Sequence, residues 1–179
     1  MNVVIVDGPN WNYWRREIYE ACGHNLDIIK VAELLVGKDF EFLYVSLKPV
    51  TEAYEKFVYA ISCDPRVITF LKDRDSIIFE EKDAWVDQKI KELIVEKGRT
   101  LSKGEKLALM SRDGDFVESV QEVKNINPNV EIVIPEFYLP SPHVSSSPKP
   151  SVSPVNYWLE AEANTIVNLG EHLSEISIN

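Results

Sequence analysis

Three aspartates stand just after apolar runs of this sequence. Asp7 follows the run 2–6, and Asp113 and Asp115 follow the run 106–111 in the stretch SRDGDF. In open parallel sheets, ligands bind at the carboxyl ends of the strands. If both runs form strands, Asp7 and Asp113 are predicted to lie at the same edge of a sheet.

A fourth aspartate, Asp87, falls in a helical pattern that begins near Asp83. The apolar stripe of that pattern consists of Val86, Ile90, Leu93 and Ile94. At about 100° per residue, Asp87 lies on the shoulder of this stripe, so its carboxylate is expected to face the sheet. A position in the first turns also lets the helix dipole favour the ionised form.

Each of these acids also has a structural explanation, which is the stronger one when each is taken singly. The loop DGPN (7–10) is good turn chemistry, Asp87 is a first-turn charge, and Asp113 or Asp115 would cap a helix. Together, however, three or four carboxylates at one edge repel one another unless a cation neutralises them. Oxygen ligands of this kind suit Mg²⁺ or Mn²⁺, so the group predicts a metal site.

Aromatic and basic residues follow the first acid. Trp11, Tyr13 and Trp14 come directly after DGPN, with Arg15 and Arg16 behind them. Beside a metal site, such rings would stack on bases and the arginines would hold phosphates. A helix that begins near Trp11 would instead pack the rings into the core. Base stacking and core packing both stay open as explanations. They are compatible if one of the rings packs in the core and another faces the cleft.

Short apolar runs alternate with helical patterns along the chain. Strands are predicted at 2–6, 41–46, 66–71, 106–111 and 130–134. Most of these runs are almost continuously apolar, as strands buried on both faces are. Helices are predicted at 27–36, at 51–61, from 83 to about 97, and from Asp113 or Asp115 to Val123. The alternation predicts an α/β fold with a parallel, doubly wound sheet.

The length of 179 residues predicts a single domain, 1–179. The segment 139–155 contains six serines and five prolines, so it is expected to be an exposed insertion. Residues 156–170 carry a helical apolar face and a short β-like run, which predicts a closing helix and strand.

Composition limits the classes of function. The net charge of −10 argues against broad electrostatic capture of nucleic acid, so any nucleic-acid substrate would be met through metal ions or local basic residues. No apolar run approaches the roughly 18 residues of a membrane span, and no signal peptide is expected. Cys22 and Cys63 have no metal-binding spacing, which indicates a reduced, cytoplasmic setting.

Four stretches come in an order and spacing that resembles NYN-domain proteins, a branch of the PIN-like nuclease superfamily. They are VVIVDGPNWNYW, AWVDQKIKELI, LALMSRDGDFVESVQEVKN and VEIVIPEF. The later stretch YWLEAEANTIVNL resembles the closing helix and strand of that domain, so the likeness covers most of the chain. It implies a Rossmann-like three-layer sandwich with a mostly parallel sheet of about five strands. It also implies a ribonuclease that hydrolyses RNA phosphodiester bonds with Mg²⁺ or Mn²⁺.

The resemblance implies a role for each matching residue. Asp7 matches the acid after the first strand, and Asn10 matches the polar residue beside it. Asp87 matches the acid of the central helix, and Asp113 and Asp115 match a pair of acids after a later strand. Asp7, Asp87 and Asp113 would hold the metal. Asp115 would bind the metal ion or orient a water molecule. Asn10 would position the ion or the water.

The chain departs from the family pattern at three positions. Arg112 stands where glycine is common, Asn164 stands where aspartate is common, and Leu93 stands near the place of a second helix acid. These departures bear on the number of metal ions and on turnover. The candidate RNA contacts are Trp11, Tyr13, Arg15 and Arg112.

Other acidic or phosphate-binding α/β families fit less well. A receiver domain needs paired acids after its first strand, a haloacid-type phosphatase needs Asp-x-Asp where Asp7-Gly8-Pro9 stands, and a P-loop needs GxxxxGK[ST]. The main alternative is a PIN-like module that binds RNA or a protein partner without cutting. A homodimer or another protein partner is left open.

Overall fold

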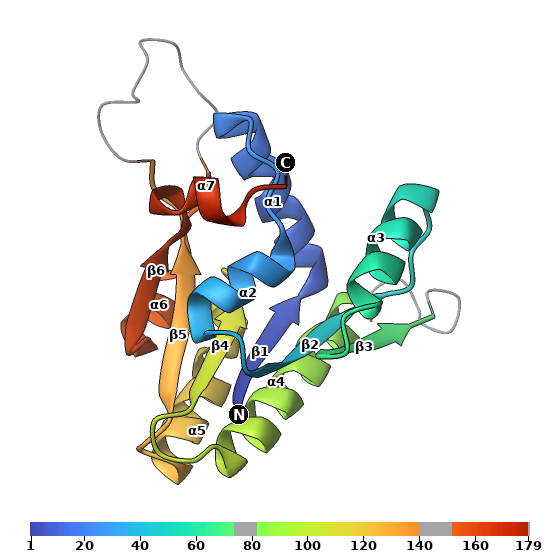
Figure 1. Cartoon of the computed structure of the whole chain (residues 1–179). Coiled ribbons are helices and arrows are strands. Elements are labelled where there is room, and N and C mark those ends of the chain that lie inside the picture. The colour runs from blue at the N-terminus through green and yellow to red at the C-terminus, as the bar shows by residue number, and fades with distance from the viewer. Residues whose placement is uncertain (74–81, 140–151, 179) are drawn as a thin grey trace.

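A parallel sheet, whose central strands are buried on both faces, forms the frame of the protein. The computed structural model describes residues 1–73, 82–139 and 152–178, which are drawn in colour in Figure 1. The strands are β1 (Asn2–Asp7), β2 (Phe40–Leu47), β3 (Val67–Lys72), β4 (Lys106–Met110), β5 (Glu131–Glu136) and β6 (Thr165–Asn168). They form one six-stranded sheet in the order β3-β2-β1-β4-β5-β6, and each neighbouring pair is parallel.

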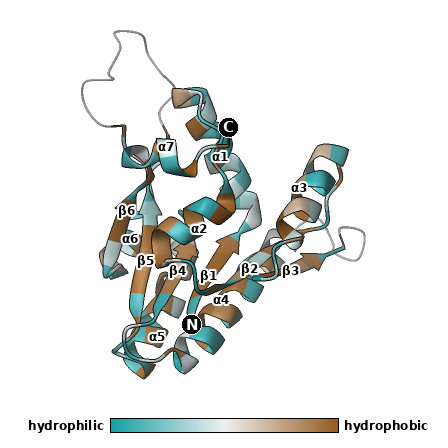
Figure 2. Ribbon diagram, viewed as in Figure 1, coloured by the Kyte–Doolittle hydropathy of each residue, from teal (hydrophilic) through white to brown (hydrophobic). Residues whose placement is uncertain are grey.

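Helices cover both faces of this sheet. They are α1 (Gly8–Cys22), α2 (Ile28–Val36), α3 (Glu52–Ser62), α4 (Lys82–Thr100), α5 (Val117–Ile126), α6 (Tyr157–Glu162) and α7 (Leu173–Ile176). Successive strand residues point to opposite faces, so Val4 and Val6 join a core with α1, α2, α3 and α7, and Val3 and Ile5 join a core with α4, α5 and α6. The result is a three-layer α/β sandwich, as predicted, with apolar strands between helices that turn polar faces outward (Figure 2).

Side-chain caps decide where the first helices begin. Asp7 caps α1 by accepting a hydrogen bond from the backbone N–H of Asn10. Asp27 caps α2 through the N–H groups of Ile29 and Lys30, and Thr51 caps α3. These caps confirm the predicted starts of the second and third helices, because an N-cap oxygen satisfies backbone donors that have no partner in the first turn.

Two boundaries differ from the prediction. The first helix begins at Gly8 rather than near Trp11, because Asp7 provides its cap. After β4, the chain forms a 3₁₀ turn, η2 (Gly114–Phe116), before α5 begins at Val117. The helix predicted from Asp113 or Asp115 therefore starts later, and Asp113 caps the turn instead.

The closing segment adds the sixth strand. The helix and strand expected within 156–170 are α6 and β6, and β6 pairs with β5. A second 3₁₀ turn, η3 (Leu169–Glu171), leads from β6 towards α7. Residues 140–151 of the serine- and proline-rich segment lie outside the described residues, so the expectation of an exposed insertion at 139–155 stays a prediction for them. At the carboxyl end of that range, Val155 is 4% exposed and belongs to the core.

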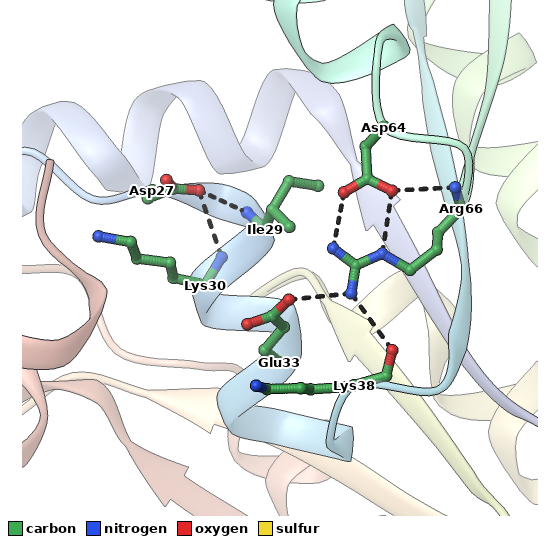
Figure 3. A network of polar contacts seen from close by, with 7 residues as sticks. All are labelled: Asp27, Ile29, Lys30, Glu33, Lys38, Asp64 and Arg66. Carbon is green, nitrogen blue, oxygen red and sulfur yellow. Dashed lines mark hydrogen bonds and ion pairs between the residues drawn. The ribbon is translucent and has the colours of Figure 1, made fainter.

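A network of charged groups joins loops at the amino ends of the strands, away from the predicted site. The guanidinium of Arg66, directly before β3, makes two bonds to Asp64, of 2.9 and 2.6 Å, and one of 2.9 Å to Glu33 on α2 (Figure 3). The backbone N–H of Arg66 donates a further bond to Asp64 at 2.9 Å. Its guanidinium also donates to the backbone carbonyl of Lys38 and lies 4.5 Å from the ring centroid of Phe40. The hydrogen bonds from Arg66 hold the pKa of Asp64 below its usual value.

Candidate functional site

An acidic pocket opens at the carboxyl ends of β1 and β4. The strand order reverses direction between these two strands, which is where ligands bind in open α/β sheets. The pocket has a volume of about 280 Å³. Its described lining consists of Asp7, Pro9, Asn10, Tyr13, Val86, Asp87 and Asp113. The structure thus brings three of the four predicted acids to one place, together with Asn10.

Asp7 is the most deeply placed of the three acids. It is the last residue of β1 and only 4% exposed. One carboxylate oxygen accepts from the N–H of Asn10 at 3.2 Å, and the other accepts from the hydroxyl of Ser111 at 3.0 Å. Burial raises the pKa of Asp7 from 3.8 to about 6, and the negative charges of Asp87 and Asp113 add to the rise. The two hydrogen bonds act in the opposite direction and lower the pKa, but their effect is smaller than that of burial. Ionised Asp7 is therefore costly, and a bound cation would relieve that cost.

Asp113 reaches the pocket from the turn after β4. Its Oδ1 accepts from the N–H of Asp115 at 3.0 Å, and its own N–H donates to the Ser111 hydroxyl at 3.2 Å. Asp113 thus caps η2 and lines the pocket at the same time. Asp115 is exposed and is not among the lining residues, so its described contribution is the backbone N–H that holds Asp113.

Asp87 reaches the pocket from α4 through the geometry of the helix. Val86, Ile90 and Leu93 are buried against the sheet, as the apolar stripe requires. Asp87 is half-buried beside Val86 and lines the pocket opposite the strand ends. Leu93, on the same helix, is 2% exposed in the core, where a carboxylate would be desolvated.

Ser111 is a site residue that we did not predict. It is fully buried, its hydroxyl donates to Asp7, and the same hydroxyl accepts from the backbone of Asp113. One side chain therefore joins the acid after β1 to the acid after β4. Its place directly after the apolar run, in SRDGDF, is the signal that would have indicated it.

The donor atoms of the pocket match a hard divalent cation in kind, since they are carboxylate and amide oxygens. Within 1–73, 82–139 and 152–178, no group of three or more Asp, Glu, His or Cys side chains is arranged to hold a metal ion. Mg²⁺ commonly binds through one or two protein carboxylates and keeps several waters. The Mg²⁺ or Mn²⁺ site at these acids therefore stays a prediction.

The predicted RNA contacts divide between core and surface. Trp11 and Trp14 are both fully buried and pack edge to face, with ring centroids 6.1 Å apart. Tyr13 is 67% exposed and lines the acidic pocket. A buried ring presents no face to a base, so Tyr13, not Trp11, is the aromatic candidate for stacking. Arg15 is half-buried, and its Nη1 donates to the side chain of Asn25 at 2.7 Å.

Arg112, also predicted to contact RNA, is engaged inside the protein. Its side chain is 10% exposed, forms an ion pair of 2.6 Å with Glu17 and lies over the ring of Trp14. It donates to the backbone carbonyl of Ser153, and both its backbone N–H and its Nε donate to Oδ1 of Asn10. Arg112 therefore fixes the Asn10 amide, with Oδ1 turned towards the guanidinium.

Asn164 lies away from the acidic pocket. Its side-chain oxygen accepts from the N–H of Ile132, near the start of β5, at 2.9 Å. Its own N–H donates to the carbonyl of the same residue. The amide thus helps to align β6 beside β5, at the opposite end of the strands from Asp7 and Asp113.

The fold and the pocket define an α/β protein with a parallel sheet and a cluster of acids where the strand order reverses. Comparison with models of known protein families gave no match, and comparison with curated proteins gave none either. The resemblance to NYN-domain proteins therefore stays a prediction. Among the described helices, none is long and apolar enough to cross a membrane.

Proposed function

We propose that the protein is a ribonuclease that hydrolyses phosphodiester bonds of RNA at the acidic pocket, with Mg²⁺ or Mn²⁺. One observation carries this proposal: Asp7, Asp87 and Asp113, from three different elements, line one pocket at the carboxyl ends of β1 and β4. Burial and the two neighbouring acids make ionised Asp7 costly without a cation. The sequence resemblance supports the same reaction.

Asp7, Asp87 and Asp113 are the residues that would hold the ion. When bound, Mg²⁺ or Mn²⁺ lowers the pKa of a water molecule and offsets negative charge on the scissile phosphate. Oδ1 of Asn10 accepts from Arg112, so its NH₂ group is the end left to donate to a phosphate oxygen. Ser111 holds the two strand-end acids in place, since its hydroxyl bonds to both residues.

The composition of the pocket suits phosphoryl transfer. This reaction depends on positioning and charge stabilisation more than on covalent chemistry by the protein. Among the described lining residues there is no His or Cys, and the charged groups are all carboxylates. Such a lining is suited to binding cations and, through them, phosphate groups.

The test is an RNA cleavage assay with a matched control variant. Wild-type protein is incubated with a mixture of single- and double-stranded RNA in Mg²⁺, Mn²⁺ or EDTA. We expect cleavage with either metal, none in EDTA, and none from Asp113→Asn. The control is Asp27→Asn, because Asp27 caps α2 as Asp113 caps η2 but lies outside the pocket.

Two results would contradict the proposal. Cleavage that persists in EDTA, or that survives in Asp113→Asn, would show that the pocket is not the reactive site. RNA binding without cleavage in any metal would favour the alternative function, a module that binds RNA or a protein partner without cutting. Fluorescence anisotropy with labelled RNA separates that alternative from a protein that does not bind RNA at all.

A further inference from the structure

A second pocket lies next to the acidic one. It has a volume of about 500 Å³ and lies between α1, the carboxyl end of β2 and α3. Pro9 and Tyr13 line both pockets, so the two spaces are adjoining parts of one surface. A strand that crosses the acidic pocket would therefore pass Tyr13 and reach the second pocket. Its volume lies within the usual range of small-ligand sites, roughly 300–1,000 Å³.

Aromatic rings form much of its wall. Tyr54 and Phe57 on α3 stack with an interplanar angle of 15° and centroids 6.1 Å apart. Tyr13 stands on α1 with its side chain 67% exposed. Aromatic side chains of this kind stack on nucleic-acid bases of any sequence, because every base has a π face.

A row of neutral hydroxyl groups lies at the base of the aromatic wall. The hydroxyl of Tyr54 is 2.6 Å from that of Ser46 and 2.8 Å from that of Tyr44. Burial, with a smaller effect of Tyr54, raises the pKa of Tyr44 well above its usual value. Ser46 is only 2% exposed, whereas Tyr54 is half-buried. A hydroxyl has one donor and two acceptor positions, so Tyr54, which bonds to two hydroxyls, keeps one position for the polar edge of a base.

Arg15 supplies positive charge beside these rings. It is the one charged side chain among the described lining residues. Nη1 of Arg15 donates a hydrogen bond to Oδ1 of Asn25 at 2.7 Å. The guanidinium carbon of Arg15 lies 5.9 Å from the ring centroid of Phe57. Its buried Nε has no hydrogen-bond partner in the described part of the chain. In a chain with a net charge of −10, this pocket is thus a local place for an anionic ligand.

We propose that the second pocket binds one nucleotide of the RNA strand, next to the phosphate that lies over the acidic pocket. Tyr13 stacks on the base, the hydroxyl of Tyr54 meets the base edge, and Arg15 attracts the phosphate. The inference rests on the proposed function, since it assigns a substrate subsite to that reaction. It also explains how an acidic protein would hold RNA: contacts to a base replace a broad basic surface.

The test is a substitution that fills the second pocket and leaves Tyr13, Arg15 and Tyr54 unchanged. Ala53 on α3 is exposed and lines the second pocket but not the acidic one, so Ala53→Trp would occupy the space of a base. Ala60→Trp is the matched control, because Ala60 is exposed on the same helix outside the pocket. Affinity is measured by fluorescence anisotropy in EDTA, with a fluorescein-labelled RNA octamer of mixed sequence. Melting curves check that both variants fold.

We expect Ala53→Trp to weaken RNA binding by roughly 5- to 100-fold, the loss seen when a stacking contact is removed. Tyr13→Ala should weaken RNA binding by a similar factor. Its control is Tyr59→Ala, because Tyr59 is exposed and lies outside the pocket; this variant should weaken binding by less than about twofold. Adenosine 5′-monophosphate should compete with the octamer more strongly than ribose 5-phosphate does. Equal competition by the two would show that no base is bound and would overturn the proposal.

The outcomes separate this inference from the ribonuclease proposal. If Ala53→Trp binds RNA as well as Ala60→Trp does, the nucleotide subsite is wrong, even if wild type cleaves RNA with Mn²⁺. If Ala53→Trp loses affinity while wild type shows no cleavage in any metal, the subsite stands and the ribonuclease proposal fails. If wild type does not bind the octamer in EDTA, the nucleotide subsite is overturned, and the ribonuclease proposal is decided by the cleavage assay with Mg²⁺ or Mn²⁺.

Discussion

Replacing Asp7 by asparagine should stabilise the metal-free protein at neutral pH, although Asp7 is a helix cap. The carboxylate is 4% exposed, and its pKa is raised from 3.8 to about 6, first of all by burial. Asparagine keeps a side-chain oxygen that accepts from the N–H of Asn10, and asparagine caps helices as well as aspartate does. Its NH₂ group can donate to the hydroxyl of Ser111, in place of the bond that Ser111 now donates to Asp7. The substitution therefore removes a costly charge and retains the cap.

The size of the effect follows from the pKa. A rise from 3.8 to about 6 corresponds to roughly 3 kcal/mol of free energy, because each pKa unit is worth about 1.4 kcal/mol. Well below pH 3.8, Asp7 is protonated in both the folded and the unfolded state, so its charge costs nothing. Between about pH 3.8 and pH 6, the unfolded chain has released the proton while the folded wild type still binds it, so the wild type loses stability as the pH rises; above about pH 6 the loss is complete. The asparagine variant has no such loss.

Urea unfolding of both proteins in EDTA, from pH 4 to pH 7.5, measures this difference. We expect the variant and wild type to be nearly equal at pH 4 and the variant to be more stable by up to about 3 kcal/mol at pH 7.5. In a chain of this size, that is roughly 6–12 °C in melting temperature. Mn²⁺ should raise the melting temperature of wild type and leave that of the variant unchanged, since the variant lacks a ligand.

Asp27→Asn is the control for capping alone. Asp27 also accepts from backbone N–H groups at a helix start, yet it lies outside the acidic pocket. We expect it to change stability by less than about 0.5 kcal/mol across the pH range. The reasoning is refuted if Asp7→Asn is less stable than wild type at pH 7.5, or if the difference between them does not change with pH.

Three further changes test other parts of the structure. Asp113→Asn should abolish metal-dependent cleavage yet leave the melting temperature in EDTA equal or higher, because its oxygen still caps η2 and the repulsion of Asp7 is reduced; an equal Mn²⁺ shift in wild type and variant would refute the metal site. Arg66→Ala should lower the free energy of unfolding by about 2 kcal/mol at pH 7. The pKa of Asp64 is lowered by Arg66, so this stabilisation is present above pH 3.8 and lost as the pH falls further; an equal loss in urea unfolding at pH 7 and pH 3 would exclude the ion pair as its source. Gly8→Ala should destabilise the fold by roughly 1–3 kcal/mol, because its Cβ would lie 2.7 Å from Cβ of Ser46 and 2.8 Å from the Tyr44 hydroxyl; an unchanged melting curve would contradict the close packing of α1 on β2.

Much of the scaffold could be predicted from sequence because its signals are local. Almost continuous apolar runs predicted β1, β2, β4 and β5, since a strand covered on both faces needs apolar residues at successive positions. The places of Asp7 and Asp113 followed from the ends of those runs. The place of Asp87 followed from helix periodicity, which puts it next to buried Val86 and at the pocket.

Tertiary structure decided which polar and aromatic side chains face the pocket. Trp11 and Tyr13 are two residues apart, yet the rotation of α1 against the sheet buries one and exposes the other. Arg112 pairs with Glu17, 95 positions earlier in the chain, and no local pattern indicates that contact. Asp113 lines the pocket, whereas Asp115, two residues later in the 3₁₀ turn, is exposed outside it.

The second pocket had no sequence signal at all. Its walls come from α1, β2 and α3, and its hydroxyl row joins Ser46 and Tyr44 of β2 to Tyr54 of α3. Hydrophobic periodicity and capping residues determine each element by itself, because they act through neighbours along the chain. A pocket depends on how separate elements pack, and that is decided by side-chain volumes that meet only in the folded protein.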